Sequence, residues 1–159
     1  MKKIPSFTVN HDDLLRGIYV SRQDAIGNEM VTTFDIRTKL PNREPVMNTA
    51  EIHAMEHLAA TYLRNHPQEA DDVVYFGPMG CRTGFYLILK GDKTSQDAVQ
   101  LITETFEFIA NYEGEIPGAS SRDCGNFLDM NLPMAKYEAK LFLDNTLNQL
   151  TDANLNYPA

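Results

Sequence analysis

The segment between Asn48 and Asn65 constrains the fold most, because it carries a complete helix pattern together with clustered ionisable residues. Asn48 is a good N-cap, and Glu51 three positions later can return a hydrogen bond as in a capping box. Apolar residues then recur at steps of three and four, giving one stripe: Ile52, Met55, Leu58, Ala59, Tyr62 and Leu63. Asn65 and Pro67 end the pattern. The sequence therefore predicts an amphipathic helix here.

This helix places two imidazoles beside a carboxylate. His53 and His57 are spaced i, i+4, so both rings lie on one face and can converge on a divalent ion. Glu56 projects from the helix at a different angle around its axis from the two histidines. It is close enough to reach a metal-bound ligand without binding the metal. A surface helix with incidental histidines is the alternative reading of such a short motif. Because both histidines border the apolar stripe, we favour a site at the edge of the core.

A third metal ligand cannot be chosen from sequence spacing. Catalytic metals usually have three protein ligands and one open position. Cys124, Cys81 and Glu138 are the candidates. Cys81 follows a Pro-Met-Gly turn and precedes Arg82, whose positive charge would favour the thiolate, so it suits a general base. Cys124 ends a loop rich in Gly, Pro and Ser and is followed by Gly125, which suits a ligand carried on a flexible loop.

Length and charge exclude several classes of protein. The chain has 159 residues, which predicts one domain over 1–159, with 151–159 as a loose tail. A net charge of −8 argues against a nucleic-acid partner. We expect neither a signal peptide nor a membrane span, and therefore a cytoplasmic protein. With two cysteines, a disulfide framework is not expected.

The pattern of elements predicts an α+β fold. Strands are expected at 7–9, 17–22, 30–37, 73–76 and 84–89. A helix is expected around 99–109, and a last one with Asn131 as its cap and Pro133 at its first position. The simplest arrangement is a mainly antiparallel sheet with helices packed on one face. The other face would need cover, so we expect the chain to dimerise across it.

The order H-x-x-E-H is the inverse of the H-E-x-x-H metalloprotease motif and occurs in inverzincin peptidases, which are generally much larger chains. A wider pattern is more specific. Ordered blocks at compatible spacing resemble S-ribosylhomocysteine lyase, the autoinducer-2 synthase of bacteria, over residues 6 to 150. These blocks are residues 6–11, 34–37, 41–42, 52–58, 78–86 and 124–126.

The resemblance implies a role for each site residue. Three residues would hold the metal: His53, His57 and Cys124. Two would form the acid/base pair: Cys81 and Glu56. Three would contact the substrate near the metal: Ser6, His11 and Arg37. The family is a homodimer with its active sites at the subunit interface. It uses one divalent metal per subunit, with Fe(II) favoured and Zn(II) or Co(II) as workable substitutes, and no organic cofactor.

The implied reaction explains why these groups are needed. The sugar carbonyl of S-ribosylhomocysteine moves from C1 to C2 and then to C3 through metal-stabilised enediolates. Cys81 would shuttle the carbon-bound proton, while Glu56 would serve the oxygens. With the carbonyl at C3, the C5 thioether leaves by β-elimination. The products are homocysteine and 4,5-dihydroxy-2,3-pentanedione, the autoinducer-2 precursor.

Three positions depart from the family pattern. Asn10 replaces a common Asp before His11, Tyr-Phe-Gly at 75–77 replaces Asp-Ile-Ser before Pro78, and Met130 replaces a common His. We expect them to affect substrate affinity more than reaction type.

Two other functions fit the metal motif. One is a small metallohydrolase in which Glu56 activates a metal-bound water. The other is a purely structural Cys-His₂ site, against which the free carboxylate of Glu56 argues. A hydrolase has no need of a reactive Cys81, so this thiol separates it from the lyase.

Overall fold

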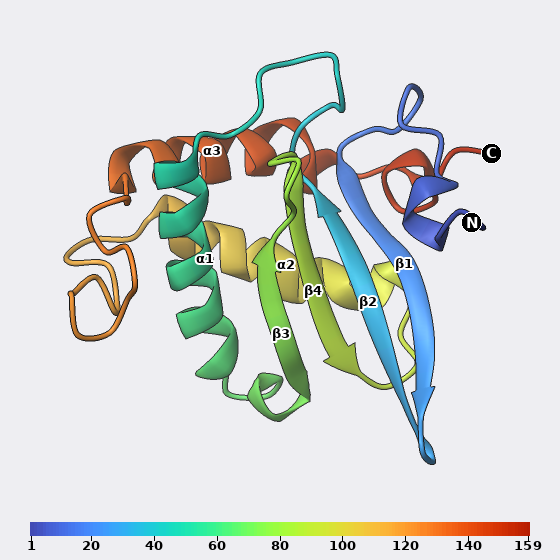
Figure 1. Cartoon of the computed structure of the whole chain (residues 1–159), viewed down its shortest axis with the longest axis horizontal. Coiled ribbons are helices and arrows are strands. Elements are labelled where there is room, and N and C mark those ends of the chain that lie inside the picture. The colour runs from blue at the N-terminus through green and yellow to red at the C-terminus, as the bar shows by residue number, and fades with distance from the viewer.

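Four strands form one antiparallel sheet in the computed structural model, which describes residues 1–159 (Figure 1). The sheet order is β1-β2-β4-β3. The strand bounds are Gly17–Ile26 for β1, Glu29–Arg37 for β2, Val73–Pro78 for β3 and Gly84–Lys90 for β4. β1 and β2 form a hairpin in which Ile26 pairs with Glu29. Gly27 makes this tight turn with a φ of 63°, a left-handed conformation that glycine adopts without a steric penalty.

Three helices complete the domain: α1 (Thr49–Arg64), α2 (Ser95–Ala110) and α3 (Leu132–Asn145). The predicted caps are present. The Asn48 backbone N–H donates to Glu51 at 2.6 Å, and the Asn131 side chain accepts from the backbone of Met134 at 3.1 Å. None of the helices has the length and apolar character needed to cross a membrane.

The core lies between the helices and one face of the sheet. Alternate strand residues point toward the helices, among them Phe34, Ile36, Phe85 and Leu87, all fully buried. Phe106 of α2 meets Phe142 of α3 edge to face, with ring centroids 4.9 Å apart. Figure 1 shows α2 crossing behind the sheet and α1 running beside β3. The predicted α+β class with an antiparallel sheet is therefore confirmed.

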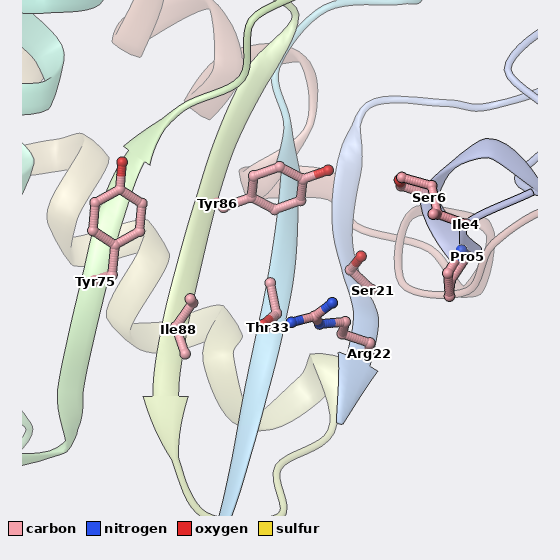
Figure 2. A pocket seen from close by; sticks show the side chains of 9 residues that line it. All are labelled: Ile4, Pro5, Ser6, Ser21, Arg22, Thr33, Tyr75, Tyr86 and Ile88. Atoms are coloured by element: carbon pink, nitrogen blue, oxygen red, sulfur yellow. The ribbon is translucent and has the colours of Figure 1, made fainter. Parts of the chain in front are cut away.

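No α-helix packs on the opposite face of the sheet. Tyr75, Tyr86 and Ile88 stand on this face beside Thr33, and the N-terminal residues 4–6 border it (Figure 2). Together they line a cavity of about 390 Å³. Tyr75 is 48% exposed, so this surface presents apolar and aromatic groups to solvent. Dimerisation across this face remains a prediction.

The two ends of the chain differ from the sequence-based expectation. The strand expected at 7–9 is wrong, because Pro5–Phe7 is a 3-10 helix that the Thr8 hydroxyl closes by donating to the Pro5 carbonyl at 2.6 Å. Residues 151–159, expected to be a loose tail, contain a 3-10 helix at Asp152–Asn154. The Asn154 side chain donates to the Arg16 carbonyl at 2.8 Å, which ties this segment to the start of β1.

Candidate metal centre and active site

His53, His57 and Cys124 come together although Cys124 follows the second histidine by 67 positions in the sequence. Their ligand atoms all lie within 4.8 Å of one another. Nε2 of His53 is 3.5 Å from Sγ of Cys124, and the two imidazole centroids are 4.8 Å apart. The structure therefore brings Cys124 to the histidine pair. Glu138 is engaged elsewhere, in an ion pair with Lys39 at 2.5 Å.

Backbone carbonyls fix the orientation of both imidazoles. Nδ1 of His53 is 2.8 Å from the carbonyl of Asp129, and Nδ1 of His57 is 2.8 Å from that of Pro117. A carbonyl only accepts, so Nδ1 carries the proton in each ring and Nε2 keeps its lone pair for a metal. One thiolate and two such imidazoles form a donor set that suits Zn(II) or Fe(II) with one position open. The residues present thus fit a catalytic metal.

The loop between α2 and α3 must pass very close to His57. Gly118 in this loop has a φ of 74°, and a Cβ placed there would lie 3.2 Å from Nδ1 of His57. The backbone conformation therefore favours glycine, and any larger side chain would also press closely against the His57 ring. Asn131 at the end of the loop donates from its backbone to the Ala50 carbonyl at 2.9 Å. The loop is held over α1 between Ala50 and His57, the stretch that carries both histidines.

Glu56 lies beside this cluster with its carboxylate uncommitted. It makes no hydrogen bond or ion pair within the chain, and it lines a shallow cavity of about 300 Å³ together with His57 and Gly118. A carboxylate without an internal partner, next to three groups that could hold a metal, can exchange protons with a bound molecule.

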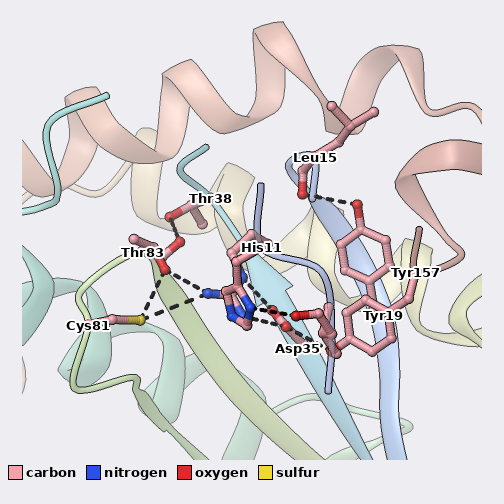
Figure 3. Close-up of polar contacts among 10 residues, drawn as sticks. His11, Leu15, Tyr19, Asp35, Thr38, Cys81, Thr83 and Tyr157 are labelled. Carbon is pink, nitrogen blue, oxygen red and sulfur yellow. Dashed lines mark hydrogen bonds and ion pairs between the residues drawn. The ribbon is translucent and has the colours of Figure 1, made fainter. Parts of the chain in front are cut away.

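A second group of candidate residues lies elsewhere. Ser6, His11, Arg37 and Cys81 line one cavity of about 280 Å³. Cys81 is exposed there, in the turn between β3 and β4, and Figure 3 shows its sulfur directed toward Thr83. No residue lines both this cavity and that of Glu56. Within one chain, then, the predicted acid/base pair of Cys81 and Glu56 is not brought into one cavity.

Arg37 organises the cavity of Cys81. Its guanidinium binds both carboxylate oxygens of Asp35, at 3.0 and 2.6 Å, and both side chains are almost fully buried. Nη1 donates to Oγ1 of Thr83 at 2.7 Å and lies 3.9 Å from Sγ of Cys81. Burial works to lower the pKa of Arg37, but the Asp35 carboxylate outweighs it and the pKa is raised. Arg37 is thus a permanent cation beside the thiol.

Thr83 completes the contact with the thiol. Its Oγ1 is 3.1 Å from Sγ of Cys81. Because Arg37 can only donate, Thr83 accepts from it and can direct its own hydroxyl proton toward the sulfur. The cation expected next to the thiol was Arg82, but the Arg82 guanidinium donates to the Met47 carbonyl at 3.2 Å. Sequence reasoning missed Thr83 and Asp35, although each lies two residues from a predicted site residue. Asp35 shares a face of β2 with Arg37, and Thr83 lies in the same turn as Cys81.

Comparison with known proteins places the chain in one family. The family model described as S-ribosylhomocysteinase (LuxS) matches residues 4–153. The chain belongs to the S-ribosylhomocysteinase (LuxS) family. It is 65% identical over 158 residues to the S-ribosylhomocysteine lyase of Clostridium beijerinckii, a match that covers 99% of each chain. It is 63% identical to that of Finegoldia magna and 52% to that of Borreliella burgdorferi, each over 158 residues. These matches cover 99% of this chain in both cases, and 99% and 100% of the respective relatives.

The three departures from the S-ribosylhomocysteinase pattern, at residues 10, 75–77 and 130, lie outside the group formed by His53, His57 and Cys124. The Asn10 side chain donates to Asp13 at 2.8 Å, whereas Nδ1 of His11 is 2.9 Å from the Val9 carbonyl. The backbone, then, and not residue 10, orients the His11 ring. Tyr75 faces the open side of the sheet, and Met130 packs against the core.

Proposed function

We propose that this chain is a metal-dependent lyase that cleaves the thioether of S-ribosylhomocysteine. The products would be homocysteine and 4,5-dihydroxy-2,3-pentanedione, the autoinducer-2 precursor, formed after two carbonyl shifts and a β-elimination. The observation that supports this most strongly is the family match over residues 4–153, which includes all three residues of the metal cluster and both acid/base candidates.

His53, His57 and Cys124 would hold one divalent ion per subunit, with Fe(II) as the favoured ion and Zn(II) or Co(II) as substitutes. The ion would supply Lewis acidity, which makes protons next to the substrate carbonyl easier to remove. Neither the carbonyl shifts nor the elimination changes the oxidation state overall, so no organic cofactor is needed.

The remaining residues would bind the sugar and move its protons. Cys81, as a thiolate beside Arg37 and Thr83, would take the proton from the carbon next to the carbonyl and return it to the neighbouring carbon. The carboxylate of Glu56 would move protons between the hydroxyl oxygens. For the final step, a proton leaves C4 and the homocysteine sulfur leaves C5 with the electron pair of the C–S bond. Ser6, His11 and Arg37 would bind the substrate.

The separation of Cys81 from Glu56 supports a site shared between two subunits. We propose a homodimer, in which the Cys81 cavity of one protomer faces the metal cluster of its partner. The Cys81 cavity adjoins the uncovered face of the sheet, because Ser6, Ser21 and Tyr86 line both. A second copy packed on that face would bury the exposed aromatic surface and would also close the Cys81 cavity. We further propose that this enzyme acts in the cytoplasm.

Free-thiol release tests the proposed function. Anaerobically purified protein of known metal content is expected to release one thiol per molecule of S-ribosylhomocysteine consumed, measured with a thiol-reactive dye. S-adenosylhomocysteine, which has the same thioether but no free sugar carbonyl, serves as the matched control and is expected to release none. If metal-loaded protein gives no thiol from S-ribosylhomocysteine, the proposal is wrong.

Metal content tests the ligand assignment separately. Replacing His57 with alanine removes one of three ligands, so the metal retained per chain after dialysis is expected to fall at least tenfold, measured by elemental analysis. His11→Ala is the matched control, because His11 lies in the other cavity, and it is expected to keep its metal. Circular dichroism would establish that both variants are folded. Full metal retention in folded His57→Ala would contradict the assignment.

A further inference from the structure

Tyr157, the third residue from the C-terminus, lies in the wall of the Cys81 cavity. Its hydroxyl donates to Oδ2 of Asp35 at 2.8 Å (Figure 3). The family match ends at residue 153, so Tyr157 lies beyond the region that it covers. The proposed mechanism assigns no role to this residue.

Asp35 connects Tyr157 to the residues next to the thiol. Oδ2 of Asp35 accepts from both Tyr157 and Nη2 of Arg37, the latter at 2.6 Å. Asp35 is only 2% exposed, so water cannot replace a lost donor easily. From Arg37 the contacts continue to Thr83 and the Cys81 sulfur. The tyrosine hydroxyl thus helps to hold the carboxylate that fixes the angle of the guanidinium.

Two features keep the Tyr157 hydroxyl in place and protonated, so that it can donate its hydrogen bond to Asp35. Its ring stacks on Tyr19, with centroids 4.7 Å apart and planes at 12°, and the Tyr19 hydroxyl donates to the carbonyl of Ala153 at 3.2 Å. Burial, followed by the nearby Asp35 carboxylate, raises the pKa of Tyr157 far above its usual value, so the hydroxyl keeps its proton.

The backbone of the C-terminal segment is also fitted to β1. A Cβ on Gly17 would lie 2.0 Å from the carbonyl oxygen of Asn154, so only glycine permits this approach. Residues 152–157 therefore form a segment that packs against β1, which we call the strap, and the ring of Tyr157 at its end reaches the cavity.

We propose that Tyr157 is a positioning residue, which acts through Asp35 to hold Arg37 in the orientation that binds the substrate and faces Cys81. This proposal deepens the proposed function and rests on it, because Arg37 is taken to contact the sugar. Removing the hydroxyl should chiefly weaken substrate binding, since the stack on Tyr19 would keep the strap in place.

The test compares Tyr157→Phe with Tyr137→Phe in the full-length, metal-loaded protein. Tyr157→Phe removes the hydroxyl but keeps the ring. Tyr137 is 54% exposed on α3 and makes no side-chain hydrogen bond, so its variant is the matched control. For Tyr157→Phe we expect KM for S-ribosylhomocysteine to rise about tenfold, which corresponds to the loss of one hydrogen bond to a charged group, while kcat falls by no more than about threefold. Tyr137→Phe should match wild type.

A merely structural role would give a different result. Fewer correctly folded molecules would lower kcat and leave KM unchanged, and either that outcome or no change in Tyr157→Phe would overturn the proposal.

A second measurement keeps the proposal testable if the wild-type protein releases no thiol, in which case the proposed function itself has failed. The rate of Cys81 alkylation by iodoacetamide, followed by peptide mass spectrometry, reports on the guanidinium beside the sulfur without any substrate. A rate at least threefold lower in Tyr157→Phe than in Tyr137→Phe would then support the positioning role, and equal rates would overturn it.

Discussion

Replacing Cys81 with serine is expected to lower thiol release from S-ribosylhomocysteine about a thousandfold while the metal content stays at the wild-type level. A serine hydroxyl fits the space of the thiol but is a far weaker acid, so it does not supply an anionic base at neutral pH. Cys81 is exposed and lies outside the metal cluster, so the exchange should disturb neither folding nor metal binding. Steady-state thiol release and elemental analysis on the same sample provide the measurement.

Cys124→Ser is the control for this experiment, because it makes the same chemical change at the other cysteine. There we expect activity and bound metal to fall together, since Cys124 is one of the three clustered residues proposed to hold the metal. If Cys81→Ser kept more than about a tenth of the wild-type rate, another group would have to carry the proton.

Mixing two inactive variants is expected to restore activity. If each active site combines Cys81 of one subunit with Glu56 of its partner, a heterodimer of Cys81→Ala and Glu56→Ala contains one intact site and one doubly altered site. Random reassortment of equal amounts makes about half of the dimers heterodimeric, so thiol release should recover to about a quarter of the wild-type rate. The structural basis is that these two residues line different cavities of one chain.

The controls for subunit mixing use the same proteins. Each variant reassorted with itself should stay inactive, and a mixture of Cys81→Ala with Arg37→Ala should also fail, because both residues line the same cavity and no heterodimer would have an intact one. Failure of the first mixture to recover, with heterodimers shown by mass spectrometry, would place the whole site within one protomer.

Local patterns in the sequence predicted the helices well, because caps and apolar stripes act over a few residues. Asn48 and Glu51 form the expected contact at the start of α1, and Asn131 caps α3. The ends of the chain could not be predicted in the same way. The hydrogen bonds that fold residues 5–8 into a 3-10 helix compete with a strand pattern only three residues long.

Contacts between distant segments limited what the sequence could predict about the site. Spacing on α1 identified His53 and His57, but the choice of Cys124 over Glu138 depends on how the loop between α2 and α3 returns to α1. The same limit explains why the sequence did not identify Arg37 as the cation beside the thiol. Arg82 is adjacent to Cys81 in sequence, yet strand pairing between β2 and β4 makes Arg37 the cation that contacts the sulfur.

Both ends of the chain meet at the Cys81 cavity, since Ser6 and Tyr157 line it together and Figure 1 shows the two termini on the same side of the molecule. During synthesis on the ribosome, this cavity cannot close until Tyr157 has emerged, so a chain that stops before Tyr157 would lack part of its wall. The same geometry bears on how the protein is produced in the laboratory. A purification tag fused to Ala159 is separated from Tyr157 by two residues, whereas a tag before Met1 is separated from Ser6 by five.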